Sequence, residues 1–259
     1  MNRSIMKNKQ KKYIRSLCVA LFWICVWQIC YWVVGHEVLV ASPFDVGKTL
    51  WKNAGEAWFW QVIFHSLLRI VKGYLFGIAI GAVAGVLATK YYILYELLYP
   101  MMSIVKASPV ASFILLTLVW MKTDSIPSFI SFLMVMPIMF TNVMEGLKRV
   151  DTDLLEVAQV YRWSLWKKIC FIYCPQLWPY MAAAATMSLG LAWKAGVATE
   201  VIASPSFSIG HKLRDSKIYM ETAELFAWTA VVIILSMLLE KGLAILLRRI
   251  QSTSRRKIR

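Results

Sequence analysis

Long apolar runs alternate along this chain with short segments that are rich in lysine and arginine. A helix rises 1.5 Å per residue, so about 20 apolar residues cross a hydrocarbon layer that is ~30 Å thick. Six runs approach or reach that length: residues 16–34, 65–88, 101–121 and 126–144, the stretch that follows Pro179, and a last stretch that begins with residues 227–239. The pattern predicts an all-α, polytopic membrane protein with six transmembrane helices.

The first run has an alternative interpretation as a cleaved signal peptide. It is longer than the apolar core of a signal peptide, and Trp32 and His36 stand where small residues would mark a cleavage site. We therefore expect an uncleaved first transmembrane helix.

Basic residues decide the expected orientation. The formal net charge is +15, and with the N-terminus inside, nineteen of the 29 lysines and arginines fall in inner segments. Cytoplasmic loops carry such an excess, so both termini and the loop at residues 151–179 should lie in the cytoplasm. The same placement, at the termini and between apolar runs, argues against a nucleic-acid partner and favours membrane lipid.

Composition leaves no room for a separate soluble domain. The chain is 59% hydrophobic with a mean hydropathy of +0.59, and it contains 12 Trp, 12 Phe and 11 Tyr. We expect a basic cytoplasmic tail at residues 1–15, a first transmembrane helix and outer segment at 16–64, a transmembrane core at 65–247, and a second basic tail at 248–259.

Local signals predict several features between the runs. We expect surface helices at residues 46–60 and 211–220, an inner turn at 90–99, and a kink at Pro109, because proline breaks the backbone hydrogen-bond ladder. Small residues spaced four apart on one face let helices approach closely in lipid, which predicts a packing face from three glycines: Gly77, Gly81 and Gly85. Arg69 and Lys72, near the outer end of their helix, should snorkel toward water.

The sequence predicts two helices in the inner loop at residues 151–179. Asp153 can cap a helix and Glu156 can reach back to the cap, and after this helix a second amphipathic run follows at residues 165–173. Lys167 and Lys168 should point away from its apolar side. The interpretation is a docking surface for a soluble partner; the alternative is a pair of helices lying flat on lipid headgroups.

The sequence of this loop, together with several positions elsewhere in the chain, resembles a known protein family. The run Glu156-Val-Ala158, followed at family distances by Pro175 and Pro179, resembles the "EAA" loop of binding-protein-dependent ABC importer permeases. The rest of the chain is similar to the branch that serves nitrate, sulfonate, taurine and thiamine-precursor importers. Further matches are the Ser-Leu-x-Arg-x-x-x-Gly opening of the core and two residues of the fifth run: Ser66, Arg69, Gly73, Trp193 and Glu200.

The resemblance implies a type I ABC importer permease fold with cytoplasmic coupling helices. It implies two permease copies in a homodimer, two ATP-binding subunits docked on the loop, and an extracytoplasmic solute-binding protein. The residues it assigns to ATPase coupling are Asp153, Glu156, Ala158, Arg162, Lys167, Lys168 and Pro175. Arg162 stands where the family usually has a glycine, which would permit a left-handed turn, so we expect this chain to make the turn in another way.

The fifth run carries charge in apolar surroundings. A charged side chain at membrane depth costs about 2.5–3.5 kcal/mol on insertion scales and often marks a pathway. The candidate pathway residues are Lys194, Glu200, Trp193 and Met187. The alternative is that Lys194 snorkels outward and Glu200 already lies in the outer headgroup zone. Their spacing of six residues puts the two charges on different helix faces, which argues against a mutual ion pair.

No catalytic constellation is present in the sequence. It contains no GxxxxGK[ST] phosphate loop, no HExxH and no GxSxG, so we expect no catalytic residues and no cofactor in this chain, with ATP and Mg held by the partner ATPase. Cys170 and Cys174 have no further metal ligand nearby, so no metal site is expected. The rival functions are an ion-gradient-driven secondary transporter or channel, and a membrane enzyme, which would need a paired acid and base.

Overall fold

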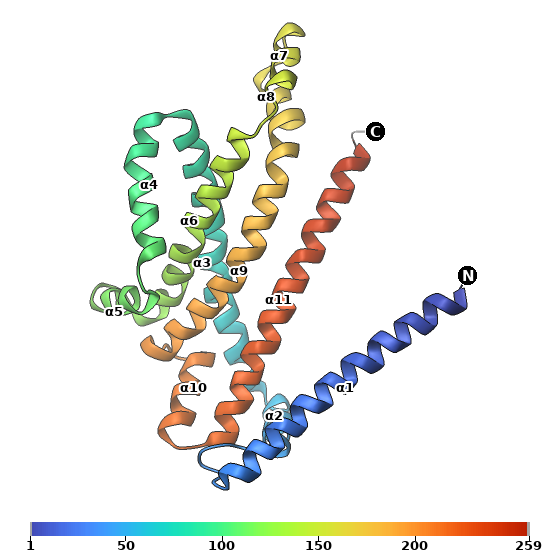
Figure 1. Ribbon diagram of the computed structural model, residues 1–259. Coiled ribbons are helices and arrows are strands. Elements are labelled where there is room, and N and C mark those ends of the chain that lie inside the picture. Colours follow the sequence, from blue (N-terminus) through green and yellow to red (C-terminus); the bar gives the residue numbers. More distant parts are fainter. Residues whose placement is uncertain (1, 258–259) are drawn as a thin grey trace. The chain divides into compact units, whose positions relative to one another are not determined.

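The computed structural model describes the backbone of Asn2–Lys257 and the side chains of Arg15 and of residues 18–250. Every regular element in this part of the chain is helical, as Figure 1 shows, which confirms the all-α prediction. The α-helices are α1 (Asn2–Val34), α2 (Pro43–Ala54), α3 (Ala57–Lys90), α4 (Tyr92–Ala107), α5 (Val110–Trp120), α6 (Ile126–Lys148), α7 (Thr152–Val160), α8 (Leu165–Lys168), α9 (Cys174–Ala203), α10 (Ile209–Ile218) and α11 (Thr222–Lys257). A 3₁₀ turn, η1 (Thr123–Ser125), precedes α6, and a π-helical turn, η2 (Ile169–Tyr173), precedes α9.

The chain divides into two compact units. One comprises the chain up to Trp60 together with Lys212–Val231, and the other comprises Gln61–His211 together with the chain from Val232 onward. Helices α3, α10 and α11 each contribute residues to both units.

In the first unit, an N-cap and a proline define the start of α2, and a hydrogen-bonded pair joins its end to α11. The Ser42 hydroxyl accepts the backbone N–H of Asp45 (3.1 Å), and Pro43 stands at the first helical position, where its missing N–H has no cost. The Asn53 amide donates to both carboxylate oxygens of Glu224 on α11 (3.0 and 2.9 Å). The predicted surface helix at residues 46–60 thus begins and ends earlier, and α3 starts at Ala57.

The second unit is organised around α6, which packs along α9 (Figure 1). Buried Val135 of α6 meets Leu189 and Ala192 of α9 in one apolar cluster, and Tyr74 of α3 belongs to the same cluster. The Tyr74 hydroxyl donates to the Ala185 carbonyl (2.9 Å), so its polar end is satisfied inside the cluster. Three long helices therefore share one core.

The glycines of α3 make its close approach to α6 possible, as predicted. A Cβ atom added at Gly81 would lie 2.6 Å from the Met136 carbonyl oxygen, and one added at Gly77 would lie 2.6 Å from the Cβ atom of Val135. Gly85 likewise faces Phe140. Larger side chains at these positions would force the two helices apart.

The third apolar run forms two separate helices instead of the single kinked helix that we predicted. We expected a turn over residues 90–99 and a kinked helix after it, but α4 already begins at Tyr92, and α4 and α5 meet at an angle of 107° across Ser108 and Pro109. Pro109 cannot donate a backbone hydrogen bond, and both residues have extended backbone angles, so the helix stops rather than bends.

Among the described residues, three helical segments are long and apolar enough to cross a membrane: Ala57–Lys90, Thr123–Lys148 and Thr222–Ile250. The bent pair α4 and α5 makes a fourth if it is one broken span, and Cys18–Val34 of α1 is a shorter apolar helix. Helix α9 has 30 residues but carries Lys194 and Glu200, which lower its mean hydropathy. The six-helix topology therefore stays a prediction.

Candidate functional site

The loop at residues 151–179 forms two helices, but the cap of the first helix differs from the predicted one. The Asp151 carboxylate accepts the backbone N–H groups of Asp153 (2.9 Å) and Leu154 (3.4 Å), so Asp151 is the N-cap and the Asp153–Glu156 capping box is wrong. The backbone N–H of Asp151 in turn donates to the Gln176 side chain (2.9 Å), a residue of α9. This contact with Gln176 of α9 fixes Asp151, rather than Asp153, at the N-cap position.

Arg162 makes the turn between the two helices in the left-handed conformation, with a φ of 50°. The Trp163 N–H bonds to the Ala158 carbonyl (2.8 Å) and the Arg162 N–H bonds to the Gln159 carbonyl (3.0 Å), which is the Schellman pattern of a helix end. The expectation that arginine would make this turn in another way is therefore wrong. Arg162 adopts the backbone conformation that glycine would adopt at less cost.

The second helix leads directly into α9. The Ser164 hydroxyl accepts the Lys167 N–H (3.5 Å) and starts α8, and the π-helical turn after it ends where the Cys174 N–H bonds to the Ile169 carbonyl. Pro175 then stands in the first turn of α9, where proline is tolerated. Helix α8 is thus continuous with α9 through η2, without a non-helical break.

The two loop helices bury little and expose much. Ala158, Ile172 and Val150 form their small buried cluster. Large apolar side chains face outward instead: Val160 and Leu165 are each 79% exposed, and Tyr161, Trp163, Trp166 and Phe171 are exposed as well. We call these six the outer loop face. Glu156 and Lys167 are exposed and Lys168 is half-buried. Exposed aromatic and aliphatic side chains of this kind mark surfaces that bind either another protein or a membrane.

The four candidate pathway residues of α9 separate into two faces. Met187 and Lys194 are exposed, and Leu191 lies between them on the same exposed face. Trp193 is fully buried, and its indole N–H donates to the Val232 carbonyl on α11 (3.1 Å). Trp193 therefore anchors α11 to α9, whereas Met187 and Lys194 lie on the exposed face of α9.

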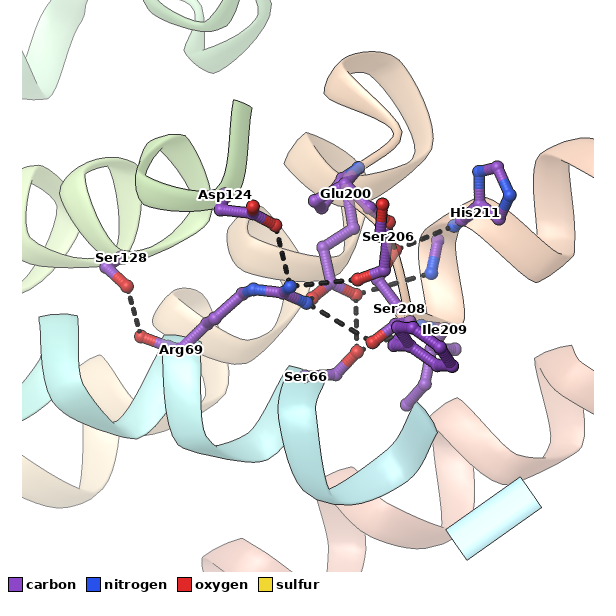
Figure 2. Close-up of polar contacts among 12 residues, drawn as sticks. Ser66, Arg69, Asp124, Ser128, Glu200, Ser206, Ser208, Ile209 and His211 are labelled. Carbon is purple, nitrogen blue, oxygen red and sulfur yellow. Dashed lines mark hydrogen bonds and ion pairs between the residues drawn. The ribbon is translucent and has the colours of Figure 1, made fainter. Parts of the chain in front are cut away.

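Glu200 is fully buried and belongs to a polar cluster, which is shown in Figure 2. Its Oε2 atom accepts a hydrogen bond from the Ser66 hydroxyl (2.7 Å) and one from the Gly210 N–H (3.3 Å). Its Oε1 atom lies 3.9 Å from the Arg69 guanidinium and has no hydrogen-bond partner among the described residues. The Ser66 hydroxyl oxygen also accepts the Ile209 N–H (2.9 Å). The carboxyl group thus joins the N-terminal part of α3, the end of α9 and the start of α10.

Arg69 completes this cluster instead of snorkelling into solvent. Its guanidinium donates to Asp124 (2.7 Å) and to the carbonyls of Ser206 (2.8 Å) and Phe207 (3.3 Å) in the loop after α9. That loop contains Phe207 at a φ of 50°, which the arginine contacts help to hold. Arg69 and Asp124 were not identified as site residues from the sequence. The available signal was the spacing of Ser66 and Arg69, which places both on one helix face.

The described residues offer no evident metal site. They contain no group of three or more His, Cys, Asp or Glu side chains that could hold an ion. Desolvation raises the pKa of the Cys174 thiol, with a smaller contribution in the same direction from Cys170, and this disfavours a thiolate at Cys174.

Comparison with curated proteins gives several relatives of one kind. The chain is 24% identical over 250 residues to the putative aliphatic sulfonates transport permease protein SsuC of Bacillus subtilis, with 93% of this chain and 88% of that protein covered. It is 27% identical over 190 residues to the bicarbonate transport system permease protein CmpB of a Synechocystis species, covering 73% and 67%. It is 25% identical over 253 residues to the taurine transport system permease protein TauC of Escherichia coli, covering 91% and 90%.

A solved structure agrees on the fold. The inward-facing MetNI methionine ABC transporter matches with a TM-score of 0.61 at 15% identity, over 72% of this chain and 93% of that chain. At that identity the match shows the fold alone, and it supports a permease architecture. The relatives are transporter permease components, which are not themselves enzymes. Residues 77–257 match the model of one family, and the chain belongs to it: the binding-protein-dependent transport system inner membrane components.

Proposed function

We propose that this chain is the permease subunit that forms, with a second copy, the pore of an ABC importer for a small sulfonate-, nitrate-, taurine- or thiamine-precursor-like solute. An extracytoplasmic binding protein delivers the solute, and two ATP-binding subunits drive transport. ATP and Mg are held by those subunits, because the sequence has no phosphate-binding loop. Family membership favours this function over an ion-gradient-driven transporter.

One observation carries the proposal: the outer loop face. Two short helices, each with its own cap, display large apolar side chains while their buried contact is small. A turn that only returned the chain to the membrane would not need them. A soluble subunit that covers this face would bury the side chains, and the stiff junction with α9 would pass its movement to the bundle.

The remaining architecture follows from the charge pattern. We propose six transmembrane helices with both termini in the cytoplasm, so that the loop at residues 151–179 is on the ATPase side. ATP binding would draw the two ATPase subunits together, move the paired loops with them, and exchange an inward-open pore for an outward-open one. Met187 and Lys194, on the exposed face of α9, would line the pathway.

The test is a proline in the first loop helix. Ala158→Pro removes a backbone N–H inside α7 and places a ring at a side chain that is 1% exposed, so it should disrupt α7. We expect the subunit to reach the membrane, to lose the ATPase during purification and to lose solute uptake.

The matched control is Ala57→Pro at the first position of α3, where proline is tolerated. This variant should keep both the ATPase and uptake. Uptake that survives Ala158→Pro while Ala57→Pro behaves as wild type would show that α7 does not couple the two subunits.

A further inference from the structure

A cavity at the break between α4 and α5 holds a lysine that the proposed function does not use. Its volume is about 320 Å³, and its lining consists of Tyr99, Met102, Ser103, Lys106, Ala107 and Thr141. Lys106 is the only ionisable cation in this lining, and no carboxylate belongs to it. The lining therefore combines one positive charge with hydroxyl groups and apolar walls.

Hydrogen bonds within the cavity orient the lysine. The Lys106 ammonium donates to the Thr141 hydroxyl oxygen (3.1 Å). The Thr141 hydroxyl has its own acceptors in the carbonyls of Pro137 (3.0 Å) and Ile138 (3.2 Å), so its oxygen is left to accept from the lysine. An ammonium has three donors, and this contact uses one of them. The other two have no protein acceptor within hydrogen-bond distance among the described residues.

The ammonium lies where α4 meets its break. Lys106 is in the last turn of α4, one residue before its end at Ala107, and Thr141 is fifteen residues from the start of α6 and seven from its end. If the pair α4 and α5 is one broken span, Lys106 stands fourteen residues from either end of it. A charge inside a membrane span costs about 2.5–3.5 kcal/mol on insertion scales and is typical of a functional position. None of the ion pairs among the described residues includes Lys106.

We propose that this cavity is an oxyanion-binding site, in which Lys106 binds a sulfonate or carboxylate group and Thr141 is the positioning residue that aims the ammonium. A sulfonate or carboxylate oxygen accepts strong, short hydrogen bonds from an ammonium, and the two remaining donors supply them. The absence of a carboxylate from the lining favours an anion over a cation. If the chain acts as proposed above, the anion is the solute at a stage of its passage; the alternative source of the same chemistry is an anionic lipid headgroup.

The experiment measures how quickly Lys106 is acetylated. The permease, purified with its ATPase, is placed in phosphatidylcholine nanodiscs without ATP, treated with an amine-acetylating reagent, and analysed by mass spectrometry with and without methanesulfonate or acetate. We expect methanesulfonate at about ten times its dissociation constant to slow the modification of Lys106 by about tenfold, because only about a tenth of the sites are then free. Lys48, an exposed lysine of α2, is the internal control and should react at an unchanged rate.

A second arm separates the two sources of the anion. Nanodiscs that contain phosphatidylglycerol, without added methanesulfonate or acetate, protect Lys106 if the site takes a lipid headgroup, and leave it reactive if the site takes a free solute. Either result supports an oxyanion site. Equal modification of Lys106 and Lys48 in every condition would overturn it.

Two variants test the assigned roles. Thr141→Val keeps the shape of the side chain but removes the acceptor, and should raise the methanesulfonate concentration for half-protection by about tenfold, since hydrogen bonds to charged groups contribute about 1.5–3 kcal/mol. An unchanged half-protection concentration would remove the positioning role from Thr141. In uptake assays Lys106→Met should raise the KM more than it lowers kcat, and Lys106→Arg should restore part of the loss.

The outcome does not depend on the loop experiment. Acetylation is measured without ATP and requires no movement of α7, so failed protection would reject this site while leaving the coupling function intact. Conversely, a loop variant that still transports would leave the protection result standing.

Discussion

The buried cluster around Glu200 makes a sharp prediction about stability. Replacing Glu200 by alanine removes the acceptor of the Ser66 hydroxyl and of the Gly210 N–H, both of which are buried. It also removes the opposite charge 3.9 Å from the Arg69 guanidinium. Both donors then lose this partner inside the protein.

The expected cost follows from these contacts. A buried donor that loses its partner costs about 1–3 kcal/mol, and two donors are affected. Arg69 keeps Asp124 and two carbonyls, so we count little for its weaker contact at 3.9 Å. The free energy of unfolding should therefore fall by about 2–6 kcal/mol. For a chain of this size each kcal/mol lowers the melting temperature by about 2–4 °C, which gives a decrease of at least about 4 °C.

Thermal unfolding of the purified subunit in detergent checks this magnitude. Glu96→Ala, which truncates an exposed glutamate of α4, is the matched control and should change stability by less than about 0.5 kcal/mol. Glu200→Gln keeps an oxygen acceptor for Ser66 and should lose only about 1–2 kcal/mol. In a double-mutant cycle, Ser66→Ala should cost much less in the Glu200→Ala background than in the wild type.

The reasoning would be refuted if Glu200→Ala melted at the same temperature as Glu96→Ala. Additive effects of Ser66→Ala and Glu200→Ala would also contradict it, since they would show that the two side chains act separately.

Three further outcomes are expected. Gly81→Leu should lower the free energy of unfolding by more than about 2 kcal/mol, because its Cβ atom would lie 2.6 Å from the Met136 carbonyl oxygen. The control Gly47→Leu has open space around the position and should not lower it, and thermal unfolding compares the two variants. Arg162→Gly should slow cleavage of the loop by chymotrypsin, and Arg162→Val should speed it, because a left-handed residue other than glycine costs about 1–2 kcal/mol. Lys194→Ala should raise the solute concentration for half-maximal ATPase stimulation and leave the amount of co-purified ATPase unchanged, which a titration and a gel measure together.

The sequence determined the features that depend on neighbours along the chain. Helical class follows from apolar runs, and the packing face of α3 follows from glycines spaced four apart, as Gly81 against Met136 illustrates. The short helices at residues 151–179 were predictable for the same reason, since they form from local caps and apolar periodicity.

Local signals failed where several neighbours could serve equally. Asp151 and Asp153 both have the chemistry of an N-cap, and the choice is made by Gln176 of α9, which accepts the Asp151 N–H. Pro109 predicted a kink, yet the angle of 107° between α4 and α5 also reflects how both helices pack against α6.

Only the tertiary structure decided which polar and charged side chains meet. Ser66 and Glu200 are separated by 134 positions, and Arg69 and Asp124 by 55, so no local pattern pairs them. Sequence spacing placed Lys194 and Glu200 on different faces of α9. The packing of α3 and α10 then buries the face with Glu200 and leaves the face with Lys194 exposed. The physical reason is desolvation: a charge is tolerated in an apolar core only where partners from distant segments converge on it, and that convergence is a property of the packed chain.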